Sequence, residues 1–207
     1  MSRIKSDDYS ILFHEHGLHI PTRTIWTCTD SDGSNGVDYT SAAQLVRNLH
    51  ILDNSGRDAI KVYLNCSGGD EYQGMLMYNA IRNCKSEVIV IASGEVCSMG
   101  TYILQAGDRR LSYPDTIFMY HIGTSNADGE SQGHFRITKN WIEFEERYRE
   151  GINQILLDRM RVADPKLTLS KLDRASDFDQ ILTAEEAFHA GLIDGILEPP
   201  SSVVEEV

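Results

Sequence analysis

The apolar positions of the chain follow two patterns, and the first is that of strands. Residues 86–93 (SEVIVIAS) are apolar and β-branched without alternation, which is typical of a strand buried on both faces. Residues 9–28 (YSILFHEHGLHIPTRTIWTC) alternate loosely and predict one or two strands around Pro21. Shorter apolar runs predict further strands at residues 58–66, 192–197 and, within 109–121, on either side of Tyr113-Pro114.

The second pattern is the three- and four-residue spacing of helices. Residues 40–52 have this spacing after Ser41-x-x-Gln44, which predicts a helix with a capping box at Ser41. A long amphipathic helix is predicted over residues 134–160. Its apolar stripe consists of Trp141, Phe144, Tyr148, Ile152 and Ile155. The same spacing predicts helices at residues 70–84, 97–107 and 183–191, the last capped by Thr183-x-x-Glu186 and followed by Gly191.

Strand and helix alternate at least four times, which predicts an α/β fold with a mostly parallel sheet. We expect a single domain over residues 1–207 with a loose tail at 198–207. Turn-forming residues predict loops at 29–36 (TDSDGSNG) and at 122–134. The 134–160 helix carries more aromatic side chains than one small sheet needs. We therefore expect it to project and to pack against a partner subunit.

The composition of the chain restricts which partners and which cellular compartment we expect for the protein. The share of charged residues, 24%, is ordinary for a soluble protein, but the net charge of −12 argues against nucleic acid or an anionic membrane as the main partner. No apolar window approaches the roughly 18 residues of a membrane span, and the start lacks the apolar core of a signal peptide. The four cysteines form no CxxC pair. We expect a cytoplasmic protein with free thiols.

Two turns at predicted strand ends could carry chemistry. One contains Gly68-Gly69, and the other places two potential nucleophiles, Cys97 and Ser98, before a helix. The carboxyl ends of neighbouring parallel strands lie together, and backbone N–H groups in such turns can stabilise an oxyanion. Taken alone, however, two glycines also indicate a simple tight turn. A serine at a helix start is also typical of an N-cap.

Histidine is the obvious general base, and the chain has seven. His14, His16 and His19 cluster, but no second ligand-rich stretch accompanies them, which favours a solvent-exposed strand face over a metal site. His121 differs because it ends an apolar strand, although a polar residue there can also be purely structural. The sequence predicts neither a metal nor a cofactor.

Four segments in order and in register resemble the ClpP family of caseinolytic serine peptidases. They are N-x-S-G-G at 65–69, S-M-G at 98–100, M-x-H at 119–121 and D-x-x-L-T-A-E-E-A-x-x-x-G-L-I-D at 179–194. The resemblance covers about residues 20–197. It implies a crotonase-like fold with a head at about 10–121 and 161–197 and a protruding handle at about 122–160.

The resemblance also implies roles for individual residues in peptide bond hydrolysis. Ser98 matches the nucleophile, His121 the general base and Asp179 the carboxylate that orients the base. The amides of Gly69 and Met99 match the oxyanion hole. Cys97 is then better interpreted as a small core residue. An extended peptide or unfolded polypeptide substrate would lie along the following five residues: Gly68, Asp70, Ile122, Gly123 and Thr124.

Further properties implied by the resemblance concern assembly. Family members form heptameric rings that stack in pairs around a chamber, and an ATP-driven AAA+ unfoldase feeds them. This chain has Ser67 where a proline is usual, Ile122-Gly123 where Gln-Pro is frequent, and Phe178 in place of an arginine that pairs across the two rings. Whether this protein forms one ring or two stacked rings therefore stays open. The lengthened 29–36 loop lies near the family's unfoldase contacts.

Three alternatives remain at the level of sequence. One is a catalytically silent structural subunit of the same fold, which the three filled triad positions disfavour. Another is an acyl-CoA enzyme of the crotonase group, which would not need Ser98 and His121. The third is a dedicated maturation protease encoded by a virus or plasmid, which these departures from the family pattern suggest.

Overall fold

A twisted sheet forms the centre of the molecule. The computed structural model describes residues 6–27, 35–121 and 135–198. Within these residues the main sheet has eight strands in the order β1-β2-β4-β6-β7-β10, and β8 and β9 extend it beside β6. The strands are β1 (Leu18–His19), β2 (Thr24–Thr27), β4 (Ile60–Cys66), β6 (Val88–Cys97), β7 (Arg109–Ser112), β8 (Ile117–Tyr120), β9 (Gln180–Leu182) and β10 (Gly195–Ile196).

The long strand β6 has two different neighbours on one side. Its first half, Ile89–Ala92, pairs with β7, and its second half, Glu95–Cys97, pairs with β8. Strand β4 runs along the other side of β6, with a register shift between Leu64 and Cys66. All of these pairs are parallel, whereas β1–β2 and β8–β9 are antiparallel. The predicted α/β class with a mostly parallel sheet is confirmed.

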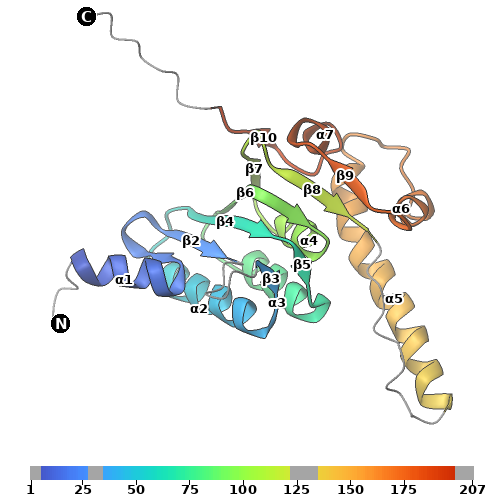
Figure 1. Cartoon of the computed structure of the whole chain (residues 1–207), viewed down its shortest axis with the longest axis horizontal. Helices are drawn as coiled ribbons and strands as arrows, with labels where there is room; N and C mark the ends of the chain where they lie inside the picture. The colour runs from blue at the N-terminus through green and yellow to red at the C-terminus, as the bar shows by residue number, and fades with distance from the viewer. Residues whose placement is uncertain (1–5, 28–34, 122–134, 199–207) are drawn as a thin grey trace, which may run out of the picture.

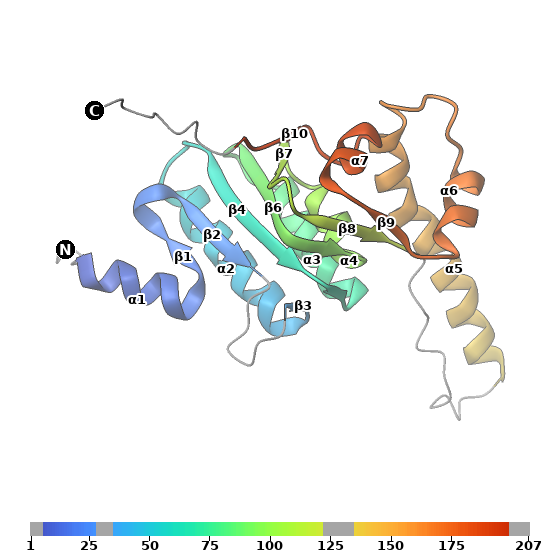
Figure 2. The same cartoon turned by 45° about the horizontal axis from the view of Figure 1, so that its top comes forward.

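Helices cover one face of the sheet and extend beyond one end of it (Figures 1 and 2). Helices α2 (Tyr39–Ser55), α3 (Glu71–Arg82) and α4 (Met99–Leu104) lie under the central strands. The long helix α5 (Phe135–Met160) extends away from the sheet (Figure 1). The remaining elements are α1 (Ser6–His16), a 3-10 turn (Ile20–Thr22), α6 (Leu169–Ser176), α7 (Ala184–His189) and a small parallel pair of β3 (Gly36–Val37) with β5 (Gly68–Gly69).

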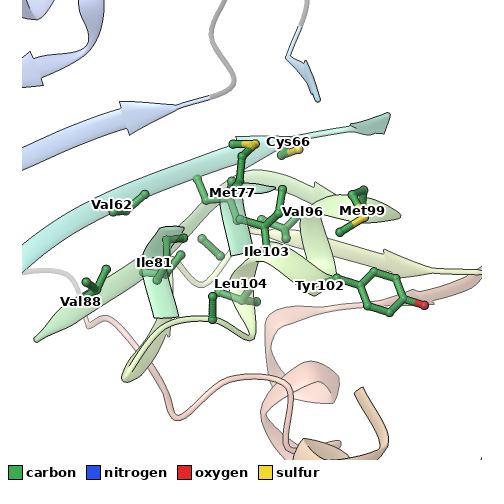
Figure 3. Packing of buried hydrophobic residues seen from close by; sticks show 14 of the residues in the cluster. Val62, Cys66, Met77, Ile81, Val88, Val96, Met99, Tyr102, Ile103 and Leu104 are labelled. Atoms are coloured by element: carbon green, nitrogen blue, oxygen red, sulfur yellow. The ribbon is translucent and has the colours of Figure 1, made fainter. Parts of the chain in front are cut away.

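Part of the core fills the space between the central strands and α3 and α4 (Figure 3), and further core residues come from α2, α5 and α6. Alternate residues of β4 enter it, from Ile60 to Cys66, whereas Lys61 on the opposite face is exposed. Strand β6 contributes Val88 and Val96, and α3 contributes Met77 and Ile81. No described helix is long and apolar enough to cross a bilayer.

Several local predictions were wrong or incomplete. Residues 6–16 form helix α1 rather than a strand, and Gly17 ends it with φ +62° while its N–H bonds the carbonyl of Phe13 at 3.0 Å. Helix α2 begins earlier than predicted, because its capping box joins Asp38 to Ser41. Helix α6 and strand β9 were not predicted. The loop predicted at 122–134 and most of the one at 29–36 lie outside the described residues.

Other local predictions were right. The capping box at Thr183 is present, and strand β10 forms within the predicted 192–197 segment.

An ion pair attaches the C-terminal segment that contains β10 to the sheet. The buried guanidinium of Arg110 on β7 bonds both carboxylate oxygens of Asp194 and the carbonyl of Gly191. It also bonds the side chain of Gln105 at 2.7 Å. Burial alone would raise the pKa of Asp194, but the hydrogen bonds from Arg110 outweigh it, so the pKa is lowered.

Replacing Asp194 with alanine should lower the free energy of unfolding. The change leaves a buried guanidinium without its carboxylate, and a loss of about 2–3 kcal/mol is expected for a pair of which one partner is partly exposed. Chemical denaturation at pH 7 measures it. Because the pKa of Asp194 is lowered in the fold, the ion pair stabilises above the unfolded-state pKa and is lost as pH falls through the folded value. The difference between wild type and variant should therefore shrink in acid, and an undiminished difference would contradict this.

Candidate active site

Three strand ends meet at one edge of the sheet. Strand β4 is followed by Gly68-Gly69, β6 by Ser98 and β8 by His121. Because β4 pairs with β6 and β6 with β8 in parallel, their carboxyl ends point the same way. The two turns and the strand-end histidine predicted from the sequence are therefore neighbours.

The side chains of Ser98, His121 and Asp179 form a hydrogen-bonded series. His121 Nε2 lies 2.8 Å from Ser98 Oγ, and His121 Nδ1 lies 3.0 Å from Asp179 Oδ1. Asp179 reaches His121 because β9 pairs antiparallel with β8 and sets Gln180 opposite Tyr120. The imidazole is 28% exposed and the carboxylate 60% exposed. The structure thus brings together all three residues that the resemblance implied.

The backbone at Ser98 has an unusual conformation. Its φ of +50° is positive, which non-glycine residues seldom adopt. The residue precedes α4, yet its side chain makes no capping hydrogen bond. Its hydroxyl is directed to His121 instead, and its N–H donates to the carbonyl of Met119 at 2.7 Å. The N-cap alternative for Ser98 is therefore not what the structure shows.

The glycines of the neighbouring turn are required by close contacts. Gly68 has φ +102°, and a Cβ there would lie 2.6 Å from Ser98 Cβ. Gly69 has φ +140°, and a Cβ would lie 2.4 Å from the carbonyl oxygen of Val37. Only glycine combines these φ values with such close approach. The turn at residues 68–69 therefore packs directly against the serine.

Cys97 is more buried than Ser98, and its thiol is held in the protonated form. It is 8% exposed, and burial, with a further effect of the Glu95 carboxylate, raises the pKa of its thiol to about 11. The thiolate is the reactive form of cysteine, so a protonated thiol is a poor nucleophile. Its position in the sheet agrees with the interpretation as a small core residue.

Some contacts around the turn were not predicted from the sequence. The Asn65 side chain accepts a hydrogen bond from the Glu95 N–H at 3.2 Å, and Asn35 donates to the Glu95 carboxylate at 2.7 Å. The bond between Asn65 and Glu95 spans the register shift between β4 and β6, and Asn35, which precedes β3, contacts Glu95 from outside these two strands. Only Gly94, with its φ of +67° close to the Asn65 side chain, marks that irregularity in the sequence.

Other predicted candidates lie elsewhere or outside the described residues. His14 and His16 lie on helix α1 rather than on a shared strand face, which corrects the earlier expectation. Within the described ranges, no group of three or more His, Cys, Asp or Glu side chains could hold a metal ion. Gly68 and Asp70 lie beside the serine turn and at the N-cap of α3. Ile122, Gly123 and Thr124 fall outside the described residues.

Comparison with known proteins agrees with this geometry. Residues 33–200 match the family model described as Clp protease. The chain is 31% identical over 166 residues to the ATP-dependent Clp protease proteolytic subunit 2 of Pseudomonas aeruginosa, and the match covers 79% of this chain and 78% of that protein. The chain therefore belongs to the Clp protease family and is a serine-type peptidase.

Proposed function

We propose that the protein is a serine endopeptidase in which Ser98, His121 and Asp179 form the catalytic triad. The observation that supports this most directly is the continuous series of hydrogen bonds of 2.8 and 3.0 Å that joins the three side chains. His121 removes the hydroxyl proton of Ser98 as the oxygen attacks the scissile carbonyl. It then protonates the leaving amine, and a water molecule hydrolyses the acyl-enzyme by the reverse transfer. Asp179 orients the imidazole and stabilises its charged form.

The amides of Gly69 and Met99 are the proposed oxyanion hole. Met99 is the first residue of α4, where helical geometry provides no carbonyl for the N–H. Gly69 is the second residue of the turn whose first residue, Gly68, packs against Ser98. Each donor of this kind is worth roughly 3 kcal/mol of transition-state stabilisation. The extended substrate would run along Gly68 and Asp70 on one side and along residues 122–124 on the other.

Oligomeric assembly is the second part of the proposal. Trp141 on α5 is 59% exposed, and Phe144 beside it is also exposed, so the helix offers an aromatic surface for another subunit. We infer a homo-oligomeric ring, expected to be heptameric, with residues 122–160 as its handle and an AAA+ unfoldase supplying unfolded polypeptide. Phe178, where the family has an arginine, is exposed beside Asp179, so ring stacking here would not use that ion pair.

The triad is tested by replacing Ser98 with alanine. Wild type should cleave a fluorogenic peptide and react with a fluorophosphonate probe, and the variant should lose both, with cleavage reduced by at least about 10³-fold. The native mass of both proteins, measured in parallel, shows whether they assemble into the proposed ring. Folded wild type of ring mass that neither reacts nor cleaves would instead favour a silent structural subunit. Equal cleavage by the variant would exclude Ser98 as the nucleophile.

The turn at Gly68 should tolerate no side chain. Gly68→Ala forces a strained φ and pushes a methyl group into Ser98, so kcat/KM for a short peptide should fall by about 10²-fold or more. Gly151→Ala is the matched control, because a Cβ at Gly151 meets nothing within 4 Å. Gly151 lies in the interior of helix α5, where alanine is more stable than glycine. The free energy of unfolding of Gly151→Ala should therefore be about 0.5–1 kcal/mol higher than that of wild type, without loss of activity. Full activity in Gly68→Ala would rule out the proposed tight turn.

Cys97 should be dispensable for catalysis. With a thiol pKa of about 11, the thiolate forms only well above neutral pH. Cys97→Ala should keep peptide cleavage within about threefold of wild type. Iodoacetamide at pH 7 should leave Cys97 unmodified, as followed by mass spectrometry of the peptide that contains it. A loss of activity comparable to that of Ser98→Ala would mean that the cysteine takes part in the chemistry.

A further inference from the structure

Three side chains outside the triad form a second hydrogen-bonded series. The hydroxyl of Tyr102 on α4 donates to Oδ1 of Asn153 on α5 at 2.7 Å. Nδ2 of Asn153 donates to Oδ1 of Asp173 on α6 at 2.9 Å. Tyr102 and Asn153 are each only 6% exposed, so the bond between them is shielded from water, whereas the bond to Asp173 is partly buried. Three helices are thus joined through polar atoms inside an otherwise apolar contact.

The protonation of Tyr102 and the charge of Asp173 determine which atoms donate and which accept in these two hydrogen bonds. Burial raises the pKa of the Tyr102 hydroxyl, and the carboxylates of Glu71 and Asp173 raise it further. The hydroxyl therefore keeps its proton and acts as the donor. The carboxylate of Asp173 can only accept, so the amide of Asn153 has one orientation that satisfies both neighbours. A fully satisfied buried series of this kind restricts the relative positions of the helices that carry it.

The first end of the series lies on the helix that follows the nucleophile. Tyr102 is four residues after Ser98, about one helical turn away. Figure 3 shows its ring extending outward from the apolar cluster formed by its neighbours on α4. Thr101 lies between Ser98 and Tyr102 in the sequence, and its hydroxyl donates to the carbonyl of Met119 at 2.9 Å. This bond connects α4 to β8, the strand before His121.

The other end lies on the helix that precedes the triad carboxylate. The carbonyl of Asp173 accepts a hydrogen bond from the N–H of Asp177 at 3.2 Å. The side chain of Gln180 donates to the carbonyl of Ala175 at 2.9 Å. Asp179 lies between Asp177 and Gln180, so the segment that carries it is bonded to α6 on both sides. A displacement of α6 would therefore move Asp179.

We propose that Tyr102, Asn153 and Asp173 are positioning residues that set the separation of Ser98 and Asp179. The inference rests on the proposed triad and concerns how its geometry is maintained. Asp179 is 60% exposed, and its side chain is held through His121, so its place depends on the backbone that carries it. Small displacements of catalytic groups reduce rates strongly even when substrate still binds.

Tyr102→Phe tests the proposal because it removes only the hydroxyl. For a fluorogenic peptide we expect kcat to fall by roughly tenfold while KM stays within about twofold. The rate of fluorophosphonate labelling of Ser98 should fall by a similar factor. Tyr78→Phe is the matched control, because Tyr78 on α3 is partly buried against the core and outside the series. It should leave both rates unchanged.

A double variant separates positioning from stability. Tyr102→Phe with Asn153→Leu removes both partners of the bond between Tyr102 and Asn153, and the half-buried carboxylate of Asp173 can be hydrated instead, so the melting temperature should recover relative to Tyr102→Phe alone. The kcat and the labelling rate should stay low. Recovery of kcat together with stability would overturn the proposal, as would wild-type kcat in Tyr102→Phe or an equal loss in Tyr78→Phe. Wild type that fails to react with the probe would instead refute the proposed triad itself.

Discussion

The carbonyl group of Met119 holds the two halves of the site in register. It accepts the N–H of Ser98 at 2.7 Å and the hydroxyl of Thr101 at 2.9 Å. Ser98 lies in the turn that leads from β6 into α4 and Thr101 lies in the first turn of α4, whereas the acceptor lies on β8, two residues before His121. One acceptor thus fixes where Ser98, the proposed nucleophile, lies relative to His121, the proposed base. A positive φ at a residue other than glycine costs about 1–3 kcal/mol, and two hydrogen bonds of about 1 kcal/mol each offset a strain of that size.

The pairing of β6 with two successive strands makes this contact possible. Its first half is occupied by β7 and its second half by β8, so the end of β6 lies beside the end of β8. On the other side, β4 delivers Gly68, whose missing side chain leaves room for Ser98. The site therefore depends on three parallel strand ends and on two positions, Gly68 and Gly69, where no Cβ fits. Parallel sheets of other proteins bind ligands at the same edge for the same reason.

The sequence predicted the elements that depend on local patterns better than those that depend on distant contacts. The unalternating apolar run at 86–93 correctly indicated a buried strand, and the capping residues at Thr183 correctly placed the start of α7. Residues 9–16 alternate only loosely and were assigned to a strand, although Gly17 is a typical helix C-cap residue. Helix α6 has a clear cap at Thr168, but it is only eight residues long and was overlooked.

The candidate site shows the same difference between local patterns, which could be predicted, and distant contacts, which could not. A strand-end histidine and two turns were visible as candidates, but only the family resemblance selected Ser98 and His121 from them and added Asp179. Asn153 was hidden because it lies in the long helix next to an aromatic stripe that suggested packing alone. Its partners are 51 and 20 residues away in the chain, a separation that no periodicity reveals. Side-chain pairs of this kind arise from tertiary packing, and local sequence carries no signal for them.

The site is consequently rigid on one side and open on the other. Ser98 lies between the end of β6 and the start of α4. The side chains next to it in both elements are almost fully buried, so close packing fixes its position. Asp179 stands on an exposed segment between α6 and β9, next to the exposed Phe178 and Ile181. The geometry of the proposed triad therefore depends most on whatever constrains Asp179. Inside one chain the Tyr102–Asn153–Asp173 series does so, and in the proposed ring any subunit that covers Phe178 would act on the same segment.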